Sequence, residues 1–368
     1  MNFHISHNGC EPSLIDLTSI KTQLIFKYGL SETSIENAHI LIYLGCTFSE
    51  QKENEVITQI QQFSNFNNKT IIISGCYLER YIKSKNILYT RPNKVVNYLV
   101  NHFKLKEVNS NTKNNNIPLV KISNGCFGQC TFCSIKFVKG RHVSRPMSDI
   151  MEEIAKLQKK YRIIKLVGQD IAGYGIDSSS SLKKLLEQIF LLFPNLKIEL
   201  GSLNPNILKQ FSDNELSIFS HPNIEGDIHI PLQSASNNIL KKMKRNYTFE
   251  DFLKIYNKIK KNGTKYVSTD LISGFPTENE TDHMENINFI RNIDINFAQI
   301  FMYDVRTGTI AASMPQLPRN IRIKRTTELI SEFIISYTRN NKLSYSDIIT
   351  ISKDMLFNTN INLNNETI

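Results

Sequence analysis

Short apolar runs of strand-forming residues recur along this chain of 368 residues, and stretches with helical spacing separate them. Helical spacing is clear at Ile150, Ile154 and Leu157, for example. Strands that alternate with helices pair in parallel, through crossovers of one hand. The sequence therefore predicts an α/β fold, with strands at 3–6, 40–44, 70–74, 118–122, 163–167, 197–201, 228–232, 266–272 and 298–303.

An asparagine-rich segment without periodicity interrupts this pattern and is predicted to be a linker. The strands before it suit a small doubly wound domain, and the six after it suit a partial (β/α)6 barrel. A helix from Ile323 to Arg339 and a polar tail are expected at the end. The expected parts are a first domain at 1–106, the linker at 107–117, a barrel domain at 118–318 and a C-terminal helix and tail at 319–368.

Composition indicates the cellular location of the chain and the kind of partner that it binds. No run of about 18 apolar residues occurs, so no membrane span is expected, and the N-terminus lacks the features of a signal peptide. A cytoplasmic location is therefore expected, where cysteine clusters indicate metal binding or catalysis more than disulfides. The net charge of +10 is compatible with a polyanionic partner such as RNA, and a lysine-rich, asparagine-rich composition is the alternative source of part of it.

Three of the six cysteines lie within one short stretch, GCFGQCTFC, at residues 125–133. Cys126, Cys130 and Cys133 follow a predicted strand and precede a predicted helix, at the mouth of the first β/α unit. Iron–sulfur clusters are held by cysteine thiolates, and three ligands on four irons leave one iron open. Gly128 lets the backbone turn between the first two cysteines. A zinc site is the alternative, with His142 as the nearest fourth ligand, but structural zinc sites usually use two ligand pairs.

The other three cysteines, Cys10, Cys46 and Cys76, each follow a glycine just beyond a predicted strand of the first domain. Ligand sites of doubly wound sheets gather outside the carboxyl ends of strands. We therefore expect these three thiols to converge on one edge of the sheet and to form a second metal site. The alternative is that they are buried structural cysteines, because free cysteine is common in protein cores.

The stretch GCFGQCTFC at a strand end resembles the signature of the radical S-adenosylmethionine superfamily. The chain is also similar, over most of its length, to the methylthiotransferase family of that superfamily. The similar blocks are SIKFVKGRHVSRP (134–146), LVGQDIAGYGID (166–177), HIPLQSASNNILKKMKRNYT (229–248), STDLISGFPTENETD (268–282) and FMYDVRTGTIAASM (301–314), together with the segments around Cys10, Cys46 and Cys76.

This resemblance implies two [4Fe–4S] clusters, one on each cysteine triad, each with an open iron. The cluster on Cys126, Cys130 and Cys133 would bind S-adenosylmethionine and cleave it to a 5′-deoxyadenosyl radical. The cluster on Cys10, Cys46 and Cys76 would hold the sulfur that is inserted into an unactivated C–H bond of the substrate and methylated. No catalytic side chain is assigned beyond the clusters.

Polar residues at later strand ends are weaker candidates for binding the cofactor. According to the resemblance, the superfamily holds the amino group of S-adenosylmethionine at the position of Gly168, Gln169 and Asp170. Gln233 and Asp270 follow or end later strands and face the same mouth. Each of the five is equally consistent with an ordinary polar residue at a strand end. The turn GFPTE at 274–278 is as consistent with a structural role as with a functional one.

The substrate is the least determined part of the sequence-based hypothesis. A tRNA adenosine is favoured narrowly over a protein or peptide side chain, such as an aspartate of a ribosomal protein, with an electron donor such as flavodoxin or ferredoxin. Both branches of the family generally carry a C-terminal β-barrel for docking, whereas only residues 319–368 follow here. We expect the docking module to be missing, reshaped or supplied by a partner. A different class, an RNA-binding scaffold with structural clusters, would not cleave S-adenosylmethionine.

Overall fold

The computed structural model describes the chain except residues 9–10, 47–49, 76–86, 107–116, 307 and 342–368. The chain divides into two compact units. The first unit comprises residues 1–116 and 137–140, and the second unit comprises residues 117–136 and 141–368. In the part of the chain that the structure describes, no helix is long and apolar enough to cross a membrane.

A five-stranded parallel sheet forms the centre of the first unit, with the order β2-β1-β3-β4-β5. Its strands are β1 (Asn2–His7), β2 (Ser31–Glu32), β3 (Ile40–Gly45), β4 (Thr70–Gly75) and β5 (Ile87–Tyr89). Its helices are α1 (Glu11–Thr22), the π-helix η1 (Gln23–Lys27), α2 (Glu50–Ser64) and α3 (Pro92–Phe103). The short strands β2 and β5 were not predicted, because two or three residues are too few to show a period.

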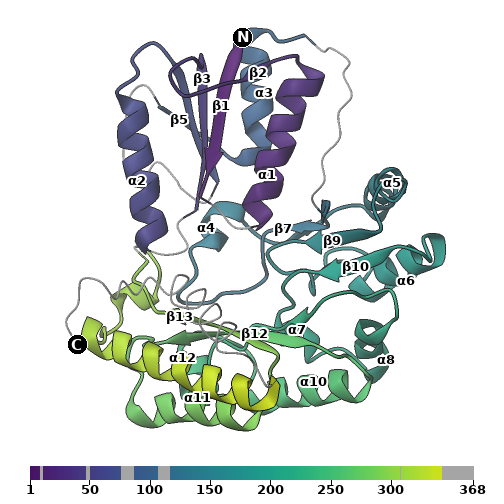
Figure 1. Ribbon diagram of the computed structural model, residues 1–368, viewed down its shortest axis with the longest axis vertical. Helices are drawn as coiled ribbons and strands as arrows, with labels where there is room; N and C mark the ends of the chain where they lie inside the picture. Colours follow the sequence, from purple (N-terminus) through teal and green to yellow (C-terminus); the bar gives the residue numbers. More distant parts are fainter. Residues whose placement is uncertain (9–10, 47–49, 76–86, 107–116, 307, 342–368) are drawn as a thin grey trace. The chain divides into compact units, whose positions relative to one another are not determined.

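Helices cover both faces of this sheet (Figure 1). Side chains alternate along a strand, so Ile40 and Ile42 of β3 pack with residues of α1 and α3, while Leu41 and Tyr43 pack with residues of α2. Both faces are therefore apolar, as expected of a parallel sheet covered by helices. Residues 137–140 join this unit through an ion pair between Lys139 Nζ and Asp16 Oδ2 at 2.9 Å.

The second unit holds six parallel strands in two three-stranded sheets, ordered β10-β9-β6 and β11-β12-β13. These strands are β6 (Leu119–Lys121), β9 (Ile163–Val167), β10 (Lys197–Leu200), β11 (Ile228–His229), β12 (Val267–Ser273) and β13 (Phe297–Met302), and a small antiparallel pair is formed by β7 (Ser123–Asn124) and β8 (Val143–Ser144). The helices are α4 (Ile135–Lys139, at the border of the units), α5 (Met147–Leu157), α6 (Leu182–Leu192), α7 (Pro205–Leu208), α8 (Asp213–Leu216), α9 (Asn237–Lys242), α10 (Phe249–Lys261), α11 (Glu280–Asn292) and α12 (Arg319–Asn341), with 3-10 turns η2 (Ser217–Ser220) and η3 (Ala311–Ser313).

The predicted α/β class with a partial barrel is confirmed, and every predicted strand is present. The barrel strands differ from the expectation in one respect, because they form two sheets with a break between β10 and β11. Single backbone hydrogen bonds connect the sheets there, from Leu203 N to His229 O at 3.0 Å and from Glu225 N to Ile198 O at 2.9 Å. Pro231 follows β11 and has no amide hydrogen, which limits how far this strand extends.

The helix predicted from Ile323 to Arg339 is observed as α12, which begins at Arg319, directly after Pro318, and ends at Asn341. A proline directly before a helix is tolerated because the first helical amides have no partner within the helix. The polar tail and nearly all of the predicted linker lie outside the described residues.

Candidate functional site

The cysteine loop, residues 126–133, leaves β7 through a sharp turn at Gly125, whose φ of +74° suits glycine. Gly128 N donates a hydrogen bond to Cys126 Sγ at 3.2 Å. A Cβ atom placed on Gly128 would lie 3.2 Å from Cys126 Sγ and 3.5 Å from Cys130 Sγ. Both sulfur atoms therefore lie close to the same side of Gly128, and the loop curls around this position.

Thr131 anchors the loop to the elements behind it. This residue is buried, its amide donates to Met243 O at 3.0 Å, and its hydroxyl donates to Lys242 O at 3.0 Å. Its carbonyl accepts a hydrogen bond from Ala311 N at 2.9 Å. The end of α9 and the turn η3 thus hold the middle of the loop in place.

The donor set of the loop fits an iron–sulfur cluster. Burial, Asp170 and the neighbouring thiols Cys130 and Cys133 together raise the pKa of Cys126 to about 12, against a weaker opposite effect of the Gly128 amide. Thiols that disfavour each other's ionisation become ligands only when a cationic centre binds them. Within the described residues, no three Cys, His, Asp or Glu side chains converge as they would on a single metal ion. A cube-shaped [4Fe–4S] cluster suits the loop better than a single metal ion, because each thiolate then binds a different iron.

The zinc alternative required His142 as a fourth ligand. The His142 ring stacks on Phe127 with 4.6 Å between ring centroids, and its Nε2 lies 3.3 Å from Ser144 Oγ. Burial lowers the pKa of His142, so the ring is neutral at neutral pH. The described residues place His142 in a packing role beside the loop and do not bring it together with the three sulfurs around one point.

The segment after β9 meets the start of the cysteine loop. Gly125 N donates to Gln169 Oε1 at 2.8 Å, so the Gln169 side chain fixes the turn that leads into the loop. A Cβ atom on Gly168 would lie 2.5 Å from Ser123 Oγ, which leaves room only for glycine. Two of the predicted cofactor residues, Gly168 and Gln169, thus lie next to the start of the loop.

Asp170 lies deeper, with only 2% of its surface exposed. Its Oδ2 atom lies 4.0 Å from Cys126 Sγ and accepts a hydrogen bond from Asn204 Nδ2 at 3.1 Å. Burial raises the pKa of Asp170, although the Asn204 hydrogen bonds oppose this effect. The carboxylate that was expected to accept a bond from the cofactor ammonium thus contacts a cysteine of the loop. Asn204, the N-cap of α7, was not found by sequence reasoning.

Asp270 and Gln233 lie together where β11 and β12 run side by side. Asp270 Oδ2 lies 3.2 Å from His229 Nε2, and His229 Nδ1 lies 2.8 Å from Ser268 Oγ, which in turn bonds to Asp227. Burial lowers the pKa of His229, but the two aspartates outweigh it and raise the pKa above its usual value. This chain of polar contacts was also not found from the sequence, because its members come from two strands and a loop.

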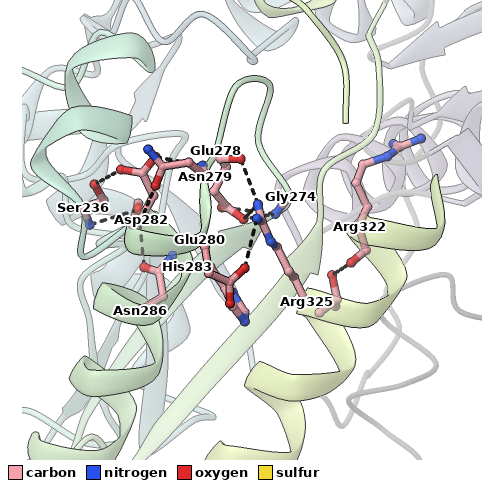
Figure 2. A network of polar contacts seen from close by, with 12 residues as sticks. Ser236, Gly274, Glu278, Asn279, Glu280, Asp282, His283, Asn286, Arg322 and Arg325 are labelled. Carbon is pink, nitrogen blue, oxygen red and sulfur yellow. Dashed lines mark hydrogen bonds and ion pairs between the residues drawn. The ribbon is translucent and has the colours of Figure 1, made fainter. Parts of the chain in front are cut away.

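Gln233 adopts an unusual backbone conformation, with a φ of +73°. The backbone amide of Gln233 donates to Asp270 O at 2.7 Å, and its backbone carbonyl accepts from Ile272 N at 2.8 Å. Residues of α11 hold the loop that follows: Asn286 Oδ1 accepts from Ala235 N at 2.7 Å, and Asp282 Oδ1 accepts from Ser236 Oγ at 2.6 Å (Figure 2). Strain in a buried non-glycine residue is typical of functional positions.

The GFPTE turn at the end of β12 is held by α12 (Figure 2). Gly274 N lies 3.2 Å from both carboxylate oxygens of Glu278, and Arg325 Nη1 donates to Glu278 O at 2.8 Å and to Glu278 Oε1 at 3.1 Å. A Cβ atom on Gly274 would lie 2.7 Å from Arg322 Cγ. Thr277 has a φ of +66°. The turn is therefore strained and fixed by the C-terminal helix.

Among the cysteines of the first unit, Cys46 is described and buried, whereas Cys10 and Cys76 lie outside the described residues. The strands that precede the three cysteines, β1, β3 and β4, are neighbours in the sheet. Gly45 and Gly75, the residues before Cys46 and Cys76, are direct partners in the β3–β4 pairing. The convergence of the three thiols on one sheet edge remains a prediction, and the strand order supports it.

A cysteine loop with this spacing at the mouth of a partial β/α barrel defines a radical S-adenosylmethionine enzyme. Residues 120–290 match the Radical SAM superfamily, and residues 2–97 match the uncharacterized protein family UPF0004. The tRNA-2-methylthio-N(6)-dimethylallyladenosine synthase of Karelsulcia muelleri is 31% identical over 398 residues, which cover 94% of this chain and 87% of that protein. The chain belongs to the radical S-adenosylmethionine methylthiotransferase family, whose members are transferases that use S-adenosylmethionine and [4Fe–4S] clusters.

Other relatives agree with this membership. The probable threonylcarbamoyladenosine tRNA methylthiotransferase of Archaeoglobus fulgidus is 28% identical over 353 residues, covering 89% of this chain and 82% of that protein. The radical S-adenosylmethionine methyltransferase TsrM from Kitasatospora setae shares the fold, with a TM-score of 0.60 and 12% identity over 84% of this chain and 75% of that one. The cobalamin-dependent enzyme OxsB has a TM-score of 0.56 and 12% identity over 100% of this chain and 62% of that one. The predicted family membership is thus confirmed.

Proposed function

We propose that this protein inserts sulfur into a C–H bond of a tRNA adenosine and methylates it, giving a 2-methylthio nucleoside. The curated relatives described above are named as tRNA methylthiotransferases or synthases. This favours tRNA over the protein or peptide side chain that was the alternative. An electron donor such as flavodoxin or ferredoxin is part of the proposal, as is a cytoplasmic location, where tRNA is available.

We assign Cys126, Cys130 and Cys133 as the ligands of the cluster that binds S-adenosylmethionine. When bound, the cluster together with S-adenosylmethionine would supply the one-electron chemistry that activates an unreactive C–H bond. No side-chain base accomplishes this activation. The protein's own residues build its surroundings. Gln169 fixes the entry of the loop, and Asn204 holds Asp170 beside Cys126.

Residues 118–318 form the proposed radical domain, and residues 1–106 hold the proposed second cluster on Cys10, Cys46 and Cys76. The observation that carries this second site is the strand order of the first unit. Three neighbouring parallel strands, β1, β3 and β4, each lead into a Gly-Cys pair, whose glycine is the last residue of β3 and of β4. Parallel neighbours end at the same edge, so one edge receives three cysteines. Gln233 and Asp270 remain candidates for cofactor binding in the second unit.

The proposal is tested with protein prepared and reconstituted without oxygen. The protein is incubated with S-adenosylmethionine, dithionite and tRNA that carries either N(6)-dimethylallyladenosine or threonylcarbamoyladenosine. The tRNA is then digested, and its nucleosides are analysed by mass spectrometry. We expect the mass gain of one methylthio group in place of a hydrogen on one of the two nucleosides. Unmodified tRNA, with both clusters loaded and S-adenosylmethionine cleaved, would overturn the tRNA substrate.

Two triple variants separate the roles of the cysteines. With Cys10, Cys46 and Cys76 changed to alanine, we expect the protein to cleave S-adenosylmethionine and leave the tRNA unmodified. With Cys126, Cys130 and Cys133 changed to alanine, we expect neither cleavage nor modification. Methylthiolated tRNA from the first variant would contradict the role of the first unit. Iron and sulfide analysis of each variant, with about four of each per chain, controls for cluster loading.

A further inference from the structure

Arg245 reaches the cysteine loop from the segment that follows α9. Its Nη1 atom donates to Cys130 Sγ at 3.4 Å, and its Nη2 atom donates to Pro231 O at 3.3 Å. The backbone bends sharply just before it, because Lys244 has a φ of +54° and Arg245 N donates to Leu240 O at 2.9 Å. The guanidinium therefore bridges the carbonyl after β11 and a predicted cluster ligand.

Two aromatic rings hold the guanidinium in this position. Its central carbon lies 6.0 Å from the centre of the Phe132 ring and 5.5 Å from that of Tyr247. Tyr247 is itself fixed, since its hydroxyl donates to Leu232 O at 2.7 Å and also lies 3.2 Å from Pro231 O. A guanidinium stacked on aromatic rings loses little freedom when it makes its hydrogen bonds.

The positive charge of Arg245 lies beside the loop and acts on the nearby Asp170 carboxylate. Its guanidinium is in direct contact with Cys130 Sγ. The guanidinium is a permanent cation, because arginine is not deprotonated in proteins, and one of its N–H groups is aimed at a sulfur atom.

A cation that donates a hydrogen bond to a thiolate stabilises the more negative, reduced form of the cluster that the thiolate holds. Hydrogen bonds to the sulfur ligands are among the features that set the reduction potentials of iron–sulfur clusters. Lys241 and Lys242, at the end of α9, add positive charge nearby, but no contact between their side chains and the cysteines is observed in the described residues. Of these three basic residues, Arg245 is the one that donates to a ligand sulfur.

We propose that Arg245 is a positioning residue that raises the reduction potential of the loop cluster through its hydrogen bond to Cys130 Sγ. This inference rests on the proposed cluster at the loop, and it is independent of the identity of the substrate. It predicts that the cluster becomes harder to reduce when the guanidinium is removed, while the protein still folds and still binds iron.

The test is a redox titration of the full chain with Cys10, Cys46 and Cys76 changed to alanine, so that only the loop cluster is present. The reduced fraction is followed by electron paramagnetic resonance in the parent and in Arg245→Gln. At a fixed ambient potential we expect the ratio of reduced to oxidised cluster to fall about tenfold, which is about 59 mV for a one-electron couple. Lys241→Met, an exposed change on α9, is the matched control and is expected to shift the potential little.

An unchanged potential in Arg245→Gln, with iron and sulfide equal to the parent, would overturn the proposal. If Arg245→Gln does not bind iron, Arg245→Met decides, because it keeps much of the apolar stem and removes both the charge and the hydrogen-bond donor. A lowered potential in Arg245→Met supports the role of the guanidinium, and an unchanged one overturns it. The titration uses no tRNA, so a failure of the proposed substrate leaves its result intact.

Discussion

The backbone amide of Cys46 donates a hydrogen bond to Asn8 Oδ1 at 2.7 Å, and this bond joins the ends of two neighbouring strands, β1 and β3. The Asn8 amide group donates in turn to Lys52 O at 2.8 Å and to Glu55 Oε2 at 3.1 Å, both in α2. Asn8 stands two residues before Cys10 in the sequence. A single side chain therefore connects the approach to one predicted cluster ligand with the backbone of another.

We expect Asn8→Ala to weaken the proposed second cluster. In a background with Cys126, Cys130 and Cys133 changed to alanine, the remaining thiols are those of the first unit, so bound iron reports on this site. Loss of the Asn8 acceptor leaves the Cys46 amide without its partner, which costs about 1–3 kcal/mol. Iron per chain should fall well below that of Asn54→Ala, an exposed control on α2. Full iron content in Asn8→Ala would contradict this role.

Gly75 is expected to tolerate no side chain, because its φ is +90° and a Cβ atom would lie 2.5 Å from Gly45 O. Gly263 is a suitable control, since its φ is +102° and nothing lies within 4 Å of a Cβ atom there. Gly75→Ala should lower the free energy of unfolding by about 1–3 kcal/mol more than Gly263→Ala, because it adds a steric clash to the same kind of backbone strain. Urea unfolding measures the free energy of unfolding of both variants. Equal losses of this free energy would show that β3 and β4 separate without cost.

Much of this arrangement could be predicted from the sequence because it depends on local patterns. Apolar runs of four to seven residues indicated the long strands, and the position of Cys126, Cys130 and Cys133 after a strand placed the loop at a barrel mouth. The helix after Pro318 followed from its spacing. These features need only the period of the side chains and the residues that flank each run.

The contacts around the loop could not be predicted in the same way, because they join residues far apart in the sequence. Arg245 meets Cys130 across 115 positions, and Asn204 meets Asp170 across 34. Nothing in the spacing of KKMKR distinguishes Arg245 from the exposed lysines beside it. Which basic residue turns inward depends on the left-handed turn at Lys244 and on the stacking rings, and both arise only in the folded chain.

A pH dependence of stability is expected from Glu278, which is 3% exposed. Burial raises its pKa from 4.5 to about 7, against the opposing effect of Arg325. Because the folded state binds the proton more tightly than the unfolded state, this group's contribution is complete below pH 4.5 and is lost as the pH rises through 7. Relative to Glu278→Gln, the unfolding free energy of the parent should fall across this window by up to about 1.4 kcal/mol per pH unit.

Urea unfolding of the parent and of Glu278→Gln at a series of pH values measures this difference directly. Glutamine keeps the shape of the side chain and does not titrate, so the comparison removes the other ionisable groups. Parallel pH profiles of the two proteins would show that Glu278 is ionised in the fold throughout the window.

Arg325 and Arg291 both join α11 and the residues around it to α12, yet we expect their removal to have very different effects. Arg325 is buried and donates to Glu278 O and to Glu278 Oε1, whereas Arg291 makes an exposed ion pair with Glu332, with 2.8 Å between Nε and Oε2. Arg325→Met removes the charged partner of a buried carboxyl group, which then keeps only the Gly274 amide as a donor, and this costs about 3–5 kcal/mol. Arg291→Met removes a surface pair, which costs at most about 1 kcal/mol.

The double variant Glu278→Gln with Arg325→Met tests whether the loss arises from the unpaired carboxyl group. Its cost should be smaller than the sum of the two single changes, because no buried acid remains to be compensated. Urea unfolding of the four proteins closes the cycle. If Arg325→Met costs no more than Arg291→Met, then α12 does not hold the GFPTE turn through this contact, and the strained backbone at Thr277 must be maintained by the packing of Phe275 instead.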